Sequence, residues 1–158
     1  MNIHLVPVNI KNKEIISDLL KEYQKEVLKQ KKVEEYKYLD SYWQDPDRYP
    51  YFIKVNKVTV GFVLVNSYSL VEKEAKSISE FYVKNEFRNK EIGKLAAYNA
   101  FDLFLGKWEI RELNDNVPAQ SFWRKVINEY TNGNFKEIVL NNKDWHGPVQ
   151  VFNNNKTS

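Results

Sequence analysis

Three strand-like segments follow one another between residues 51 and 84, and this run constrains the fold more than any other feature. Residues 51–55 and 58–68 are separated only by Asn56-Lys57, a connection of the length that tight hairpins use, and Asn tolerates positive φ. Residues 77–84 then alternate apolar and polar side chains. Because no helical stretch separates these segments, we predict an antiparallel meander.

Apolar periodicity before this run predicts one more strand and two helices. Residues 2–6 alternate and stop at Pro7, which is typical of a short strand. Residues 12–30 place apolar side chains at helical spacing, with Lys and Glu on the other face, and predict an amphipathic helix. Residues 35–43 repeat aromatic and leucine side chains at three- and four-residue steps, which predicts a second, shorter helix.

A helix and a strand are predicted directly after the meander. Residues 92–104 carry apolar side chains at helical spacing, and Gly106 is well placed to cap the end of that helix. Residues 107–113 predict a short strand. Since a helical crossover leads into it, we expect this strand to run parallel to the strand before it.

The last part of the chain predicts a further helix and two strands. Asn116 is a natural N-cap and Pro118 suits the first turn, so a helix should extend to about residue 130, before Asn132-Gly133. The last predicted strands are residues 135–140 and 148–152. The whole order is β-α-α-β-β-β-α-β-α-β-β, a mixed α/β fold.

Length and composition bound the kind of protein. The 158 residues suit one hydrophobic core, so we expect a single domain over residues 1–152 and a polar tail at 153–158. The sequence has no cysteine, which excludes cysteine nucleophiles, and only two histidines, His4 and His146, so we predict no metal site.

Charge and hydropathy exclude two classes of partner. The net charge of +3 rests mainly on lysine, which argues against a nucleic-acid partner. No apolar run is long enough to span a membrane, so we expect no membrane partner and a soluble cytoplasmic protein. The aromatic content of 15% suits a ring-lined pocket or an aromatic core equally well.

The junction between the third meander strand and the next helix is the segment richest in chemical information. A strand that enters a helix through a turn presents unpaired backbone N–H groups at the positive end of the helix dipole. Arg88, Lys90 and Lys94 add positive charge there. The local physics leaves two interpretations open: a phosphate site, or an exposed polar loop that caps a helix.

Two motifs resemble those of the GNAT acetyltransferase superfamily. Arg88-x-x-x-Ile92-Gly93-Lys94-Leu95 looks like the acyl-CoA motif, usually written Arg/Gln-x-x-Gly-x-Gly/Ala. Asn116-x-x-Ala119-x-x-Phe122-Trp123, followed by Asn134-Phe135, is similar to a second helix and strand start of that family. The predicted element order also matches. The resemblance implies a mixed, mainly antiparallel central sheet with splayed central strands, flanked by helices.

The same resemblance implies a function and a cofactor site. It implies acetyl-CoA as co-substrate and direct transfer of an acetyl group to an amine of a small molecule or peptide. The backbone near Val83 would pair with the pantetheine arm, and the N–H groups of residues 89–94 would hold the pyrophosphate. The implied cofactor residues are Phe81, Val83, Arg88, Asn89, Lys90, Glu91, Ile92, Gly93, Lys94, Asn116 and Trp123.

Two residues depart from the family pattern. Glu91 replaces the first Gly of the motif and adds a Cβ and a negative charge where the phosphates would approach. It either weakens the site or points outward to solvent and leaves binding intact. Trp123 stands where many members carry a Tyr thought to protonate the departing thiolate, and an indole N–H cannot serve as that acid.

The proposed chemistry needs a base more than an acid. A thiol with a pKa near 8.5 leaves as the thiolate at pH 7 at a cost of about 2 kcal/mol, whereas a lysine-like amine with a pKa of about 10.4 loses its proton at a cost of about 4.6 kcal/mol. Glu80 is the nearest plausible base, and its alternative is a solvent-facing or salt-bridged strand residue. Tyr130 is the candidate proton donor, with Tyr82 a weaker one.

An aromatic segment is the candidate acceptor site. Tyr36, Tyr38, Tyr42 and Trp43 lie where the family builds one wall of that site, and with Asp40 they could receive a cationic amine. Rings at helical spacing are also typical of a core, so both interpretations stay open. A non-catalytic GNAT-like module that binds CoA, another ligand or a protein is the competing function, and a homodimer is a further alternative.

Overall fold

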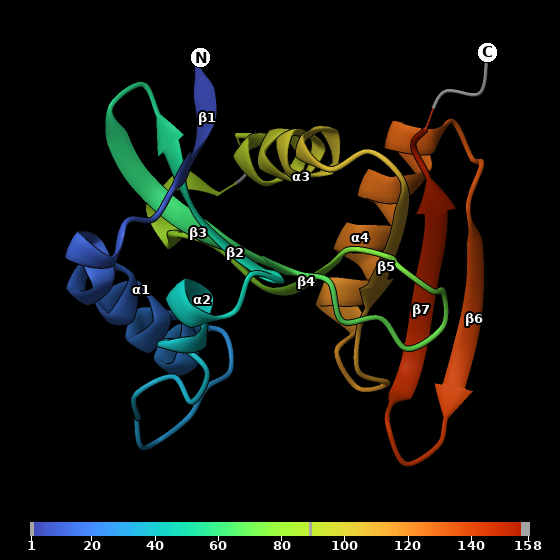
Figure 1. Ribbon diagram of the computed structural model, residues 1–158, viewed down its shortest axis with the longest axis horizontal. Coiled ribbons are helices and arrows are strands. Elements are labelled where there is room, and N and C mark those ends of the chain that lie inside the picture. The colour runs from blue at the N-terminus through green and yellow to red at the C-terminus, as the bar shows by residue number, and fades with distance from the viewer. Residues whose placement is uncertain (1, 89, 156–158) are drawn as a thin grey trace. The chain divides into compact units, whose positions relative to one another are not determined.

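The computed structural model describes residues 2–88 and 90–155 and forms two compact units (Figure 1). Met1–Val65 and Ser79–Ala96 make up the first unit, and Asn66–Ile78 and Ala97–Ser158 make up the second. Each unit contains its own antiparallel strands and packed helices. The mixed α/β class predicted from the sequence is therefore confirmed.

The first unit is built on a four-stranded sheet with the order β1-β2-β3-β4. Its strands are β1 (Ile3–Pro7), β2 (Arg48–Val55), β3 (Val58–Asn66) and β4 (Ser77–Val83). β1 pairs with β2 in an antiparallel register that sets Ile3 opposite Val55. Asn56 adopts a φ of 56° in the turn between β2 and β3, as the hairpin prediction requires. The predicted meander is confirmed, since sheet order follows chain order.

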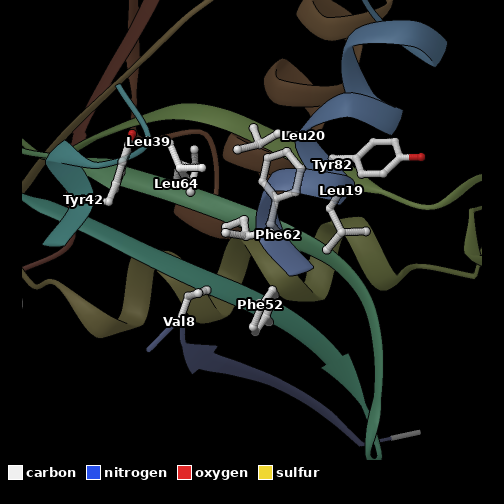
Figure 2. Packing of buried hydrophobic residues seen from close by; sticks show 10 residues of the cluster. Val8, Leu19, Leu20, Leu39, Tyr42, Phe52, Phe62, Leu64 and Tyr82 are labelled. Carbon is white, nitrogen blue, oxygen red and sulfur yellow. The ribbon is translucent and has the colours of Figure 1, made fainter. Parts of the chain in front are cut away.

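Helix α1 (Lys13–Glu26), preceded by a 3-10 turn at Ile10–Asn12, packs on one face of this sheet (Figure 2). Leu19 and Leu20 of α1 meet Phe62 of β3 in a buried cluster that also includes Phe52, Leu64 and Tyr82. The predicted helix over residues 12–30 is confirmed in its first part but ends at Glu26.

The predicted helix over residues 35–43 is wrong in extent, because only α2 (Ser41–Gln44) is helical. Tertiary contacts account for the difference. Trp43 Nε1 donates to the carbonyl oxygen of Val8 at 2.9 Å, and the Tyr42 hydroxyl lies 2.8 Å from Ser79 Oγ. The rings are thus held in the core by contacts outside the segment, and so short a helix gains little from its own propensity.

The second unit contains an antiparallel sheet with the order β5-β7-β6. Its strands are β5 (Lys107–Arg111), β6 (Lys136–Asn141) and β7 (His146–Asn153). Parallel pairing of β5 to the chain before it is limited to one described bridge, Lys76↔Trp108, immediately before β4. The expected parallel direction is confirmed at this bridge, but the pairing extends no further, because β5 takes its ladder partner from β7. The strands expected to splay, β4 and β5, belong to different sheets.

The predicted caps of α4 (Val117–Thr131) are confirmed, whereas Gly106 does not cap α3 (Ile92–Leu103), because its N–H donates to the Asn154 side chain and not to a helix carbonyl. Gly106 follows α3 with a φ of 126°. The Asn116 side chain accepts from the Ala119 N–H at 3.2 Å at the start of α4, and Asn132 ends that helix in the left-handed region with a φ of 52°. α4 packs beside β7 (Figure 1).

The polar tail expected from residue 153 begins later than predicted. β7 continues to Asn153, and the Asn154 side chain accepts from the Gly106 N–H at 2.7 Å and donates to the Phe101 carbonyl oxygen at 2.8 Å. Asn side chains bind backbone groups well, so polarity did not indicate fraying here. Residues 156–158 lie outside the described part of the chain.

Candidate functional site

β4 is an edge strand of the first unit's sheet, and its outer edge is the predicted pantetheine site. Lys84 N–H donates to the Val60 carbonyl oxygen of β3 at 2.8 Å. Because backbone groups alternate in direction along an antiparallel strand, the N–H and C=O of Val83 point away from β3. Phe81 occupies the equivalent position two residues earlier. The Val83 main chain therefore faces the open edge.

Arg88 is bound within the first unit. Its Nε donates to the Val83 carbonyl oxygen at 2.9 Å, and its Nη1 lies 2.7 Å from Glu26 Oε1 on α1. Its guanidinium also lies 5.6 Å from the centroid of the Tyr82 ring, whose hydroxyl donates to Glu26 Oε2 at 2.7 Å. We expected Arg88 to add charge for phosphates, whereas these contacts give it the role of fixing the turn that follows β4.

Glu91 adopts a φ of 61°, in the left-handed region that glycine enters most easily. Its carbonyl oxygen accepts the first bond of α3, from the Leu95 N–H at 3.0 Å. Its side chain is 72% exposed, and Oε1 lies 3.3 Å from Lys94 Nζ. Of the two alternatives for Glu91, this geometry is the outward-facing one, and the backbone conformation explains why glycine suits this position.

The start of α3 offers the predicted phosphate donors. The N–H groups of Ile92 and Gly93 precede the first intrahelical bond and have no acceptor within the helix. The Ile92 side chain is fully buried and anchors this end of the helix. Lys90 lies beside it, with Nζ 5.9 Å from the centroid of the Phe87 ring. Asn89, also predicted to contribute, lies outside the described residues.

Glu80 lies in a pocket of about 310 Å³ within the first unit. Burial raises the pKa of its carboxyl group to about 6, and a hydrogen bond from Tyr23 partly offsets that rise. Tyr23 lines the same pocket from α1, and burial raises the pKa of its phenol strongly, so it stays a hydrogen-bond donor. Glu80 is therefore a buried carboxylate with a tyrosine partner, ionised at neutral pH and close to the pH range where it can accept a proton.

The aromatic segment is divided between the pocket and the core. Tyr36 and Tyr38 line the pocket beside Glu80. Tyr42 and Trp43 belong to the packed core instead, and Figure 2 shows Tyr42 among the buried residues of the cluster. Asp40, which we expected to attract the amine, forms an ion pair with Lys13. Tyr36 also packs against this core cluster, so the acceptor-site interpretation stays a prediction for Tyr36 and Tyr38.

The remaining predicted residues lie in the second unit with structural contacts of their own. The Asn116 side chain caps α4, as described above. Trp123 is buried, with its ring centroid 6.4 Å from that of Phe101. The Tyr130 hydroxyl donates to Asp102 Oδ1 at 2.6 Å, and burial together with this bond raises its pKa to about 12. The side chains of these three residues are engaged in packing, capping or hydrogen bonding.

Two buried carboxylates of the second unit were missed by the sequence analysis. Glu109 is fully buried and accepts from the N–H groups of Leu70 at 2.8 Å and of Val71 and Glu72 at 3.0 Å, and from Arg111 at 2.7 Å. Burial raises the pKa of Glu112 to about 8. Glu109 lies between apolar residues in a strand, and this pattern could have indicated a buried carboxylate with hydrogen-bond donors around it.

Neither a metal site nor a membrane segment stands out in the described part of the chain. Across residues 2–88 and 90–155, no group of three or more His, Cys, Asp or Glu side chains is gathered as metal ligands would be. His146 instead has its Nδ1 2.6 Å from Asn141 Oδ1. None of the described helices has the length and apolar character needed to cross a membrane.

Comparison with known proteins gives a family and a fold. Residues 13–127 match the model of the acetyltransferase (GNAT) family. No curated protein matches the chain in sequence.

Three of the similar solved structures, each distant in sequence, illustrate the fold. An acetyltransferase from Thermus thermophilus is 15% identical with a TM-score of 0.72, covering 97% of each chain. The PaiA N-acetyltransferase from Thermoplasma acidophilum, in complex with coenzyme A, is 15% identical with a TM-score of 0.67, covering 97% of this chain and 99% of its own. The aminoglycoside acetyltransferase AAC(6')-Ib, also with coenzyme A, is 14% identical with a TM-score of 0.71, covering 96% and 95%.

Proposed function

Because the chain belongs to the acetyltransferase (GNAT) family, we propose that it is an acetyl-CoA-dependent N-acetyltransferase acting on an amine of a small molecule or peptide. One observation carries the choice of an active enzyme. Glu80 is a buried carboxylate in a pocket, with a pKa of about 6, on the strand whose outer edge bears the Val83 main chain. A base of this kind is what transfer to an amine requires.

The cofactor would bind along β4 and the start of α3. The outward N–H of Val83 can pair with the pantetheine arm, and the Ile92 and Gly93 amides can receive phosphate oxygens with the help of the α3 dipole. Lys90 and Lys94 add positive charge at that end. Two similar structures, PaiA and AAC(6')-Ib, are complexes with coenzyme A, which supports this assignment.

Transfer would proceed by direct attack without a covalent enzyme intermediate. The amine nitrogen forms a bond to the thioester carbon, Glu80 takes the proton that the nitrogen loses, and the C–S bond breaks to release the thiolate. A backbone N–H near Val83 is the candidate donor to the oxyanion. Leaving as the thiolate costs about 2 kcal/mol at pH 7, and the thiolate is then protonated by solvent, so no acid on the protein is needed. Tyr130, bonded to Asp102, is not required in this scheme.

A non-catalytic module is the second candidate function, and Glu91 is the observation that favours it. Its left-handed backbone costs on the order of 1–2 kcal/mol relative to glycine, and its charge lies next to the proposed phosphates. A module of this kind could still bind CoA, because the Glu91 side chain faces solvent.

Thermal melting with acetyl-CoA, followed by a thiol-release assay with a panel of amines, separates these possibilities. Acetyl-CoA at 100 times its dissociation constant should stabilise the fold by about 2.7 kcal/mol. We expect that shift in both the wild type and Glu80→Gln, and much slower transfer in Glu80→Gln than in the wild type. A shift without transfer to any amine would support the module, and the absence of any shift would overturn CoA binding altogether.

A further inference from the structure

The pocket around Glu80 contains more negative charge than its described cations neutralise. Three carboxylates line it, Glu34, Glu35 and Glu80, against one lysine, Lys37. Glu35 is already satisfied, since Oε1 lies 2.9 Å from Lys21 Nζ and Oε2 accepts from Ser17 at 3.1 Å. Glu34 and Glu80 form no ion pair in the part of the chain that the structure describes. Two carboxylates therefore remain for an occupant of the pocket.

The loop that carries Glu34 is tied to helix α1. The buried side chain of Gln24 accepts from the Glu34 N–H through Oε1 at 3.1 Å. The Gln24 carbonyl oxygen also accepts from the Gln30 N–H at 2.9 Å. Gln24 and Gln30 line the pocket themselves. One glutamine thus holds both ends of residues 30–34 and keeps Glu34 at the pocket.

The pocket walls between these carboxylates are aromatic. Tyr23 and Tyr36 line the pocket with partly buried rings, and burial raises the pKa of both phenols, so neither adds negative charge of its own. Tyr38 already has Lys37 Nζ 5.3 Å and the Arg48 guanidinium 5.2 Å from its ring centroid. Tyr23 packs edge-on against Phe62 and Tyr82, and Tyr36 packs edge-on against Tyr38. Among the described residues no cation lies over either ring, so both can face a cationic or aliphatic occupant.

We infer that the acceptor is a small amine with a second positive charge, with its reacting nitrogen at Glu80 and its second ammonium group at Glu34. This inference rests on the proposed function and specifies its substrate class. The volume of about 310 Å³ lies at the lower end of the range for ligand sites, about 300–1,000 Å³, which favours a compact acceptor such as a linear diamine.

Steady-state transfer to a matched pair of acceptors tests the inference. 1,4-Diaminobutane and 4-amino-1-butanol share a reacting amine and a chain length, and they differ in whether the far end is charged. We expect kcat/KM to be about tenfold higher for the diamine, a difference of about 1.4 kcal/mol. Glu34→Gln should remove most of this preference, chiefly by lowering kcat/KM for the diamine. Glu14→Gln, an exposed carboxylate on α1 outside the pocket, is the matched control and should keep the preference.

Isothermal titration calorimetry with the two amines gives a readout that does not depend on turnover. The diamine should bind the wild type more tightly than the amino alcohol does, and Glu34→Gln should equalise them. Equal kcat/KM and equal affinity for the two amines in the wild type would overturn the inference while leaving the acetyltransferase intact. No transfer to either amine, with the difference in affinity preserved, would count against the proposed function and support the pocket's preference.

Discussion

Arg88 and Glu26 form a salt bridge of 2.7 Å that joins the turn after β4 to helix α1. The same guanidinium holds the Val83 carbonyl oxygen at 2.9 Å. One side chain therefore connects the strand edge, the turn before α3 and the helix that contributes Tyr23 to the pocket.

Replacement of Arg88 should weaken cofactor binding more than it weakens the fold. Both partners of the salt bridge are about a third exposed, so the bridge itself contributes on the order of 0.2–1 kcal/mol to the free energy of unfolding. Arg88→Ala also frees the turn that precedes the α3 amides, so we expect a several-fold rise in the dissociation constant of acetyl-CoA, measured by calorimetry. Glu26→Gln keeps the bond to Val83 and should show a smaller rise. Equal affinities in Arg88→Ala and the wild type would contradict this role.

Glu91→Gly should stabilise the protein and tighten cofactor binding. Glycine relieves a left-handed strain of about 1–2 kcal/mol but loses about 0.5–1 kcal/mol to its greater freedom in the unfolded chain, so the net gain should be below about 1.5 kcal/mol. Urea unfolding measures this gain in the free energy of unfolding. Glu91→Gln removes the charge and keeps the Cβ, so it isolates the electrostatic part of any change in acetyl-CoA affinity. A less stable Glu91→Gly variant would show that the backbone at Glu91 is not strained.

Transfer activity should rise with pH through the titration of Glu80. Burial raises the pKa of this carboxyl group to about 6, and the base is active only when ionised, so kcat/KM should increase across pH 5–7. Glu80→Gln should lower kcat/KM by about 10²–10⁴ and remove that acidic limb. Tyr23→Phe removes a hydrogen bond that lowers the pKa of Glu80, so the rise of kcat/KM with pH should have its midpoint at a higher pH. An unchanged limb in Glu80→Gln would assign it to another group.

Glu112 should make the free energy of unfolding fall as pH rises, which is the opposite of what a carboxylate with a lowered folded-state pKa does. Burial raises its pKa to about 8, so the folded state retains the proton that the unfolded state has lost. Its contribution is fully present below the unfolded value near 4.5 and is lost as pH rises through about 8. Gln150 Nε2 donates to Glu112 Oε1 at 2.9 Å and to Glu137 Oε1 at 2.7 Å, whereas the buried Glu112 Oε2 has no described partner.

Urea unfolding across pH 5–9 checks this sign. Glu112→Gln carries no titrating proton, so it should gain stability relative to the wild type as pH rises from 5 to 9. Arg124 lowers the pKa of Glu112 and pairs with Glu137 at 2.7 Å. The pH profile of stability must therefore be interpreted with Arg124 and Glu137 in mind. A constant difference between variant and wild type over this range would show that Glu112 does not titrate there.

The sequence predicted correctly those elements that depend on residues close together in the chain. The hairpin at Asn56 and the cap at Asn116 each depend on the conformational preference of one residue and its neighbours, and each is confirmed. The three-strand meander followed from alternation without an intervening helix. The family resemblance rested on two such local motifs, which is why it could be stated from the sequence.

Contacts between distant segments could not be predicted in the same way. Tyr42 and Trp43 are held by Ser79 and Val8, which lie 37 and 35 residues away in the chain. The pairing of Arg88 with Glu26 depends on where α1 lies against the sheet. Tyr23 fitted the apolar face of its helix, and nothing in the helical period showed that its hydroxyl meets a carboxylate.

The hydrogen bonds that the Glu109 carboxylate accepts limit how this protein can be divided into fragments or recombined with a relative. The chain changes unit after Val65, after Ile78 and after Ala96, so neither unit is a continuous stretch of sequence. Expression of residues 97–158 alone would leave the Glu109 carboxylate without the Leu70 and Val71 amides. A chimera with a relative should therefore exchange residues 66–78 together with β5, so that this carboxylate and its amide donors come from the same parent.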